Sequence, residues 1–143
     1  MACRPAPPRA THGPEPALTY FYLGVFAILG AFARYGQSEL VPLVLGHAFP
    51  FATLSINVIG SLLMGLLFTF TLERGNISSE LRTGMLTGGL GAYTTFSTFS
   101  LESRGLLQHG HVLLGATYMV VSALLCVLGA LLGTWMARRR GAR

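Results

Sequence analysis

The sequence predicts an all-α integral membrane protein with four transmembrane helices, of which the third is broken at a glycine-rich stretch. The chain has 143 residues, of which 52% are hydrophobic and 10% are charged, whereas an ordinary soluble domain has about 25% charged residues. Residues 40–72 and 105–137 carry no formal charge. Because about 20 mostly apolar residues cross a bilayer, these runs and the shorter apolar runs 18–33 and 83–101 account for four spans.

The charged residues and the cysteines exclude several classes of protein. All ten basic residues are arginines at predicted helix ends and in the tails, which is typical of the flanks of membrane spans rather than of a nucleic-acid surface. Cys3 and Cys126 lie in a tail and deep in the last span, so they indicate neither a disulfide framework nor a metal cluster. The sequence pairs no nucleophile with a base, and we expect no enzyme.

The chain divides into a membrane domain and two tails. Residues 1–17 are rich in proline, which cannot continue a helix, and we expect a disordered N-terminal tail. Residues 18–138 form the four-helix membrane domain, and residues 139–143 form a basic C-terminal tail.

The helices follow one another closely. The first starts near Leu18 and carries the stretch GAFARYG, with Arg34 close to its end; the second follows Pro50. The third begins after RGNISSELR, and the fourth runs from about Val112 to Ala137. Arg34 is suited either to holding its guanidinium among lipid headgroups or to attracting an anion from solution.

Polar residues recur every four positions on the second and fourth helices. Asn57 and Ser61 share one helical face, and Tyr118, Ser122 and Cys126 share another. Small residues at this spacing allow membrane helices to approach closely, which is the simplest interpretation of Ser61 and of three glycines: Gly65, Gly129 and Gly133. An amide at membrane depth is costly unless its hydrogens are used, and this favours a function for Asn57.

The third span contains the predicted break. Gly88, Gly89 and Gly91 precede Thr94 and Thr95, and glycine is the weakest helix former after proline. A break there leaves backbone carbonyls without partners, which is tolerated in a membrane only within protein or beside a cavity. Such carbonyls are hard oxygen ligands suited to a small hard cation such as Na⁺.

After the break, Phe96 and Phe99 share a helical face. One interpretation is simple packing of an aromatic pair. The other uses the positive edge of each ring, which, with the amide of Asn57 and hydroxyls such as that of Thr95, forms a corridor of weak donors. Such a corridor suits a small anion that must enter and leave readily, drawn from solution by Arg34.

Three stretches resemble the Fluc (CrcB-type) fluoride channels: GAFARY at 30–35, TLSINVIGSLLMG at 53–65 and GGLGAYTTFSTFS at 88–100. With the polar track of the fourth helix, the resemblance covers nearly everything after Leu18. It implies a passive, fluoride-selective channel that exports toxic cytoplasmic fluoride, built from four-helix subunits that pair as antiparallel dimers with two pores.

The resemblance also implies roles for individual residues. Fluoride is expected to pass the two phenylalanines, the second-helix amide and the fourth-helix hydroxyls. With Arg34 and Thr95 added from the interpretation above, the predicted pathway is Arg34, Asn57, Thr95, Phe96, Phe99, Tyr118 and Ser122. A structural Na⁺, which is not transported, is expected at the dimer centre on the main-chain carbonyls of Gly91 and Thr94. Cys126 departs from the family pattern, in which we expect a hydroxyl.

The arginines predict one preferred orientation in the cell membrane, with both termini cytoplasmic. Eight lie on the side of the termini: Arg4, Arg9, Arg74, Arg82, Arg138, Arg139, Arg140 and Arg143. The other side has only Arg34 and Arg104, and basic residues favour the cytoplasmic side. An antiparallel dimer therefore forms either with inverted copies of this chain or with a paired homologous subunit of opposite orientation.

Two other functions compete with the channel. A proton-coupled exporter of the small multidrug resistance kind also has four short helices, but it needs an ionisable group inside the membrane, whereas the five glutamates are predicted in the tail or near span ends. A non-conducting accessory subunit needs only the packing faces, and the full set of polar and aromatic residues argues against it.

Overall fold

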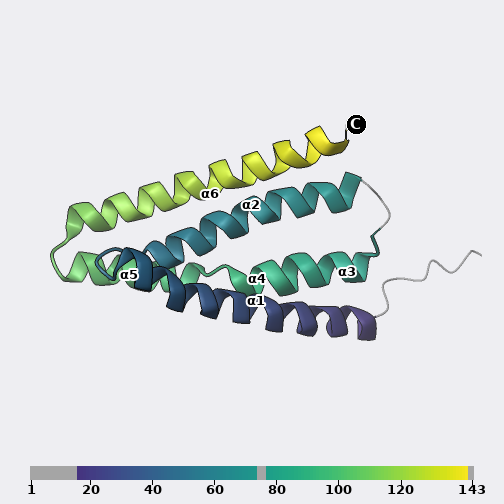
Figure 1. Cartoon of the computed structure of the whole chain (residues 1–143), viewed down its shortest axis with the longest axis horizontal. Helices are drawn as coiled ribbons and strands as arrows, with labels where there is room; N and C mark the ends of the chain where they lie inside the picture. Colours follow the sequence, from purple (N-terminus) through teal and green to yellow (C-terminus); the bar gives the residue numbers. More distant parts are fainter. Residues whose placement is uncertain (1–15, 74–76, 142–143) are drawn as a thin grey trace, which may run out of the picture.

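The computed structural model describes residues 16–73 and 77–141, and every element in these ranges is helical. Three helices are long and apolar enough to cross a membrane: α1 (Pro16–Leu45), α2 (Phe51–Glu73) and α6 (Val112–Gly141). The remaining crossing is assembled from shorter pieces: α3 (Ser79–Thr83), the π-helix η1 (Gly84–Leu90), α4 (Gly91–Tyr93) and α5 (Phe96–Gln108). The predicted all-α membrane fold with an interrupted third helix is confirmed (Figure 1).

The ends of α1 and α6 differ from the predicted boundaries. Helix α1 continues past the apolar run that ends at residue 33, because Arg34 and Glu39 interrupt the hydrophobicity but not the helix. It ends where Gly46 adopts a φ of 75° and its N–H donates to the carbonyl of Pro42 (2.8 Å), a conformation that glycine adopts without strain.

The predicted tails are only partly described. Of the N-terminal tail, residues 1–15 lie outside the described residues, and α1 begins at Pro16. Helix α6 continues to Gly141, so residues 139–141 extend the last helix rather than forming the separate basic tail that the sequence predicts. The start of α1 and the end of α6 lie at the same end of the bundle (Figure 1).

Glycines bring neighbouring helices into backbone contact. A Cβ atom added at Gly65 of α2 would lie 2.1 Å from the carbonyl oxygen of Ala130, and one added at Gly133 of α6 would lie 2.1 Å from that of Leu62. Likewise, a Cβ at Gly30 of α1 would lie 2.1 Å from the carbonyl oxygen of Gly89. Lipid gives no hydrophobic driving force between helices, so this close fit holds the bundle together.

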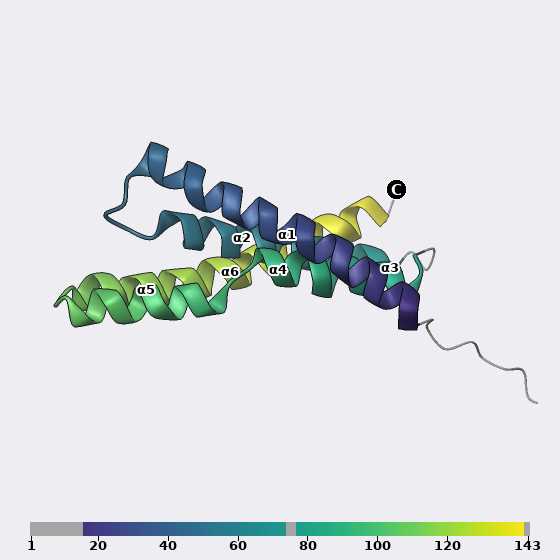
Figure 2. The ribbon, with the colours of Figure 1, turned by 90° about the horizontal axis from the view of Figure 1, so that it is seen from below.

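The break in the third crossing lies at Thr94 and Thr95, both of which are extended (φ/ψ of −77°/157° and −148°/111°). The glycines before it stay helical, first as the π-helix η1 and then as α4. The predicted position was therefore slightly early, because packing of η1 against α1 offsets the low helix propensity of glycine. The break redirects the chain: η1 and α4 pack against α1, whereas α5 packs against α6 (Figure 2).

Asn57 of α2 satisfies the backbone at the break. Its Oδ1 accepts a hydrogen bond from the Thr95 N–H (2.9 Å), and its Nδ2 donates to the Thr95 carbonyl (3.0 Å). Next to it, a Cβ added at Gly60 would lie only 2.2 Å from Cγ2 of Thr94. One face of α2 thus supplies both the hydrogen-bond partner of Thr95 and the space for Thr94.

A second polar contact anchors the residue before the break. The hydroxyl of Tyr93 donates to the side-chain carbonyl of Gln37 on α1, and the Gln37 amide donates to the hydroxyl of Ser55 on α2 (2.9 Å). Tyr93 is buried. The end of α4 is therefore fixed to two helices by hydrogen bonds that a hydrocarbon environment cannot replace.

We expect Asn57→Ala to expose the Thr95 amide, because the substitution removes the acceptor of its N–H and leaves that group without a partner. A buried unsatisfied group costs about 1–3 kcal/mol, so hydrogen–deuterium exchange in a peptide covering residues 91–98 should accelerate about tenfold or more. Ser61→Ala, one turn further along α2, is the matched control. Equal exchange in the two variants would contradict the assignment of Asn57 to the break.

Candidate functional site

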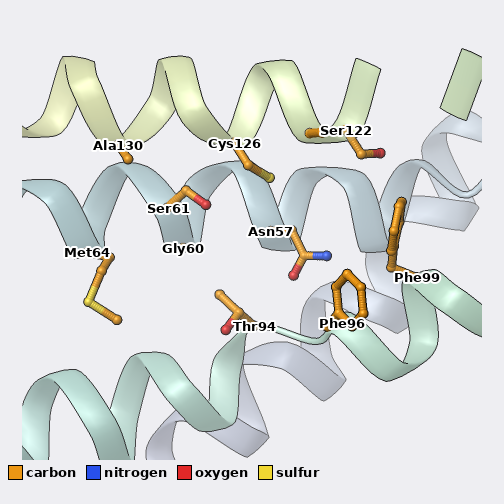
Figure 3. Close-up of a pocket in the computed structure, with 11 residues that line it drawn as sticks. Asn57, Gly60, Ser61, Met64, Thr94, Phe96, Phe99, Ser122, Cys126 and Ala130 are labelled. Atoms are coloured by element: carbon orange, nitrogen blue, oxygen red, sulfur yellow. The ribbon is translucent and has the colours of Figure 1, made fainter. Parts of the chain in front are cut away.

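A groove of about 410 Å³ runs between α2, the break with the start of α5, and α6 (Figure 3). Its lining residues are Asn57, Gly60, Ser61, Met64, Thr94, Phe96, Phe99, Ser122, Ala123, Cys126 and Ala130. None of these residues carries a formal charge. The groove therefore offers only dipoles, ring edges and apolar surface to anything that enters it.

The groove brings together most of the residues that the sequence predicts as an anion pathway. Asn57, Phe96, Phe99 and Ser122 all line it. The two phenylalanine rings lie 5.6 Å apart between centroids with 40° between their planes, and 79% of Phe96 is exposed. Phe96 is thus held mainly by its place at the start of α5, whereas Phe99 is partly buried against Tyr118 (5.1 Å between ring centroids).

Asn57 retains a donor for the groove. Its amide nitrogen carries two hydrogens, and one of them bonds the Thr95 carbonyl. In Figure 3 the side chain points toward the break and the ring of Phe96. The residue therefore stabilises the break and lines the groove at once.

Ser122 contributes a buried polar group to the groove. Only 5% of the residue is exposed, and its buried Oγ has no hydrogen-bond partner among the described residues. A buried hydroxyl without a partner is uncommon in native structures and costs free energy. The hydroxyl therefore has a hydrogen that none of the described residues accepts.

Thr95 and Tyr118 have their hydroxyls engaged elsewhere and are absent from the groove lining. The Thr95 hydroxyl accepts the N–H of Thr98 (3.2 Å) and donates to the Thr98 hydroxyl (2.9 Å), which makes it the N-cap of α5. The Tyr118 hydroxyl donates to Oε2 of Glu102 (2.7 Å), and Thr53 donates to Oε1 of the same carboxylate (2.8 Å).

Glu102 is a polar residue whose contacts the sequence does not predict. It lies within α5, directly after the predicted third span 83–101, and accepts hydrogen bonds from α2 and α6. The available signal was the pair of hydroxyls at Thr53 and Tyr118, each of which needs an acceptor when it is buried. The carboxylate of Glu102 therefore joins three helices.

A second cavity of about 490 Å³ lies beyond this carboxylate, at the connection between α1 and α2 and the end of α5. Glu102, Thr53, His47 and His109 are among its lining residues. Phe99 lines the groove and contacts Tyr118, and Tyr118 bonds Glu102 of the cavity. These three side chains therefore connect the lining of the groove with that of the cavity.

Arg34 lies apart from the groove. It is half-buried on α1, its carbonyl accepts the hydroxyl of Ser38 (2.9 Å), and it lines neither the groove nor the second cavity. The structure therefore does not bring Arg34 together with the phenylalanines.

The carbonyls of Gly91 and Thr94 lack the donors that a continuous helix would give them. Those donors would be the N–H groups of Thr95 and Thr98. The first donates to Asn57 and the second to the Thr95 hydroxyl. The described residues contain no group of three or more His, Cys, Asp or Glu side chains placed to hold a metal ion.

An apolar groove of about 450 Å³ lies beside the part of the third crossing that precedes the break. Its lining comes from α1, α2, η1 and α4, and includes Phe26, Leu29, Leu63, Met85 and Tyr93.

Comparison with known proteins places the chain in a family. The family described as "CrcB-like protein, Camphor Resistance (CrcB)" matches residues 21–134. A protein of Acidithiobacillus ferrooxidans named "Fluoride-specific ion channel FluC" is 58% identical over 119 residues, which cover 83% of this chain and 95% of the relative. A protein of the same name from Magnetococcus marinus is 50% identical over 110 residues, which cover 77% of this chain and 89% of the relative. One from Coxiella burnetii is 48% identical over 112 residues, which cover 77% of this chain and 90% of the relative. The chain is a multi-pass membrane protein, not an enzyme, and it belongs to the CrcB-like family.

Proposed function

We propose that this chain is a subunit of a fluoride-selective channel, which lets fluoride leave the cytoplasm passively through the groove. The observation that carries the proposal is the buried, unpartnered hydroxyl of Ser122 in a groove without charge, beside Asn57 and the two phenylalanines. The names of the relatives support the same ion.

The lining explains how a small anion is favoured without being trapped. Fluoride is the smallest halide and accepts hydrogen bonds strongly, so it needs donors in place of water. Asn57 and Ser122 supply an N–H and an O–H, and the ring edges of Phe96 and Phe99 add weakly positive surface. Because the lining has no fixed cation, the ion is bound weakly enough to leave again.

The proposed route continues from the groove to the second cavity past Phe99, Tyr118 and Glu102, whose contacts connect the two linings. Tyr118 contributes a donor there when its hydroxyl is released by the carboxylate. Thr95 acts on the route through the N-cap that fixes the start of α5. Arg34 contributes at a distance, by raising the concentration of anions near the membrane surface.

We further propose that the carbonyls of Gly91 and Thr94 bind a structural Na⁺ that is not transported. Two carbonyls are too few to replace the hydration shell of such an ion, so a second chain must complete the site. Antiparallel pairing across the apolar groove of α1, α2, η1 and α4 would cover exposed apolar surface of this crossing and bring the second pair of carbonyls. The partner is another copy of this chain or a homologous subunit of opposite orientation.

We expect the purified chain in liposomes to release fluoride and to retain chloride. Phe96→Ile and Phe99→Ile each remove a ring edge that presents weakly positive surface to the ion, and each should lower fluoride flux about tenfold. Phe21→Ile on α1, outside the groove, is the matched control. Equal release of the two halides would refute the channel, and full flux in both variants would mean that the phenylalanines only pack.

The sodium proposal is tested at Gly91. An added Cβ there meets nothing closer than 4.0 Å in the rest of the chain, so Gly91→Val chiefly tests what lies outside the chain, namely a cation or a second subunit. We expect Gly91→Val to lose flux and Thr94→Ser, which keeps the carbonyl, to retain most of it. Gly24→Val, equally unhindered, is the control. The proposal fails if Gly91→Val conducts fully and flux is the same when Na⁺ is replaced by a large organic cation.

Pairing is tested by the orientation of the C-terminus. With Cys3 and Cys126 replaced by serine, Gly141→Cys is labelled from outside intact cells with an impermeant maleimide. The arginine bias predicts one-sided labelling and no flux until an oppositely oriented homologous subunit is added. Near-equal labelling from the two sides together with strong fluoride flux would instead identify a homodimer of mixed orientation.

A further inference from the structure

Cys126 places a thiol inside the groove. It lies one helical turn after Ser122 on α6, is a free cysteine, and is half-buried. It lines the groove with Asn57, Ser61 and Phe96. In Figure 3 its sulfur projects from α6 toward α2, on the side of Asn57.

The neighbouring serine marks this part of the groove as a ligand position. The Oγ of Ser122 is buried, lacks a partner among the described residues and belongs to the same lining. A group attached to Cys126 would enter the same groove one helical turn from that hydroxyl. The thiol and the donor without a partner therefore share one lining.

We propose that Cys126 is a modification site at which a small neutral disulfide or thiosulfonate forms a mixed disulfide and closes the groove to anions; the closing effect rests on the proposed channel function. In the exchange, the Cys126 sulfur attacks one sulfur of the reagent R–S–S–R, whose S–S bond breaks as the new one forms. With a disulfide the products are Cys126–S–S–R and R–SH, which takes the proton of the thiol. With a thiosulfonate R–SO2–S–R the attacked sulfur is the one without oxygens, and the group that leaves with the proton is the sulfinic acid R–SO2H. Cys126 is oxidised and the departing sulfur is reduced.

The groove selects the class of reagent. Its lining has no formal charge, so a charged reagent would lose its hydration without compensation, whereas a neutral one enters at little cost. The volume of about 410 Å³ holds a methylthio group easily, since one water takes up about 30 Å³ in the liquid. An apolar adduct there covers the Ser122 hydroxyl and adds no donor. A fluoride ion at this point of the groove would therefore have lost its water without gaining a hydrogen bond from the protein.

The test uses the full chain in liposomes and methyl methanethiosulfonate as the probe. The Cys3→Ser variant keeps only Cys126. We expect its fluoride flux to fall about tenfold or more on treatment and to recover when a reducing agent removes the adduct. The Cys126→Ser variant, compared with its own untreated flux, should not respond. Intact mass measured on the same samples reports the extent of labelling independently of flux.

A matched control separates local closure from a general effect of labelling. Val127 is 59% exposed and does not line the groove. In a chain with Cys3→Ser, Cys126→Ser and Val127→Cys, the same reagent should label fully and leave flux intact. The inference is overturned if Cys126 carries the adduct while flux persists, if it stays unlabelled while Val127→Cys is labelled, or if both adducts lower flux equally. A lack of fluoride flux before treatment refutes the proposed channel itself, and the closing effect with it.

Discussion

Two hydrogen bonds between Asn57 and the main chain of Thr95 are the interaction on which the rest of this structure depends. In hydrocarbon, a backbone group without a partner costs several kcal/mol, so a membrane helix cannot simply stop and restart. The amide of Asn57 gives the Thr95 N–H the acceptor that a continuous helix would have supplied, and it adds a donor to the Thr95 carbonyl. The break then fixes where α5 begins, which way Phe96 faces, and which carbonyls lose their helical donors.

The sequence predicted the architecture well because membrane spans leave a one-dimensional signal. Hydrophobic runs located all four crossings, and residue types located the interruption, the amide and the phenylalanines. The position of the break was harder to predict from the sequence. The low helix propensity of glycine pointed to residues 88–91, but contact with α1 keeps these residues helical. That contact, such as the one between Gly30 and Gly89, exists only in the packed bundle.

Other features could not be found from sequence order alone. Glu102 ends an apolar run in the sequence, yet the turn of the chain at the break brings it between Thr53 and Tyr118. Arg34 follows an apolar run and resembles an entrance residue, but α1 packs beside η1 and α4, away from the groove. In both cases the deciding fact is which helices are neighbours, and that depends on the redirected course of the third crossing.

The interruption also has an electrostatic consequence. A helix carries roughly half a positive charge at its N-terminus and half a negative charge at its C-terminus, and normally both poles of a membrane helix lie near the aqueous surfaces. Here the negative pole of the segment ending at Tyr93 and the positive pole of α5 meet inside the bundle, with Phe96 at the start of the second segment. The protein thereby presents opposite partial charges at membrane depth without any ionisable side chain. Such charges cannot be titrated, so this part of the field is the same in acid and in neutral surroundings.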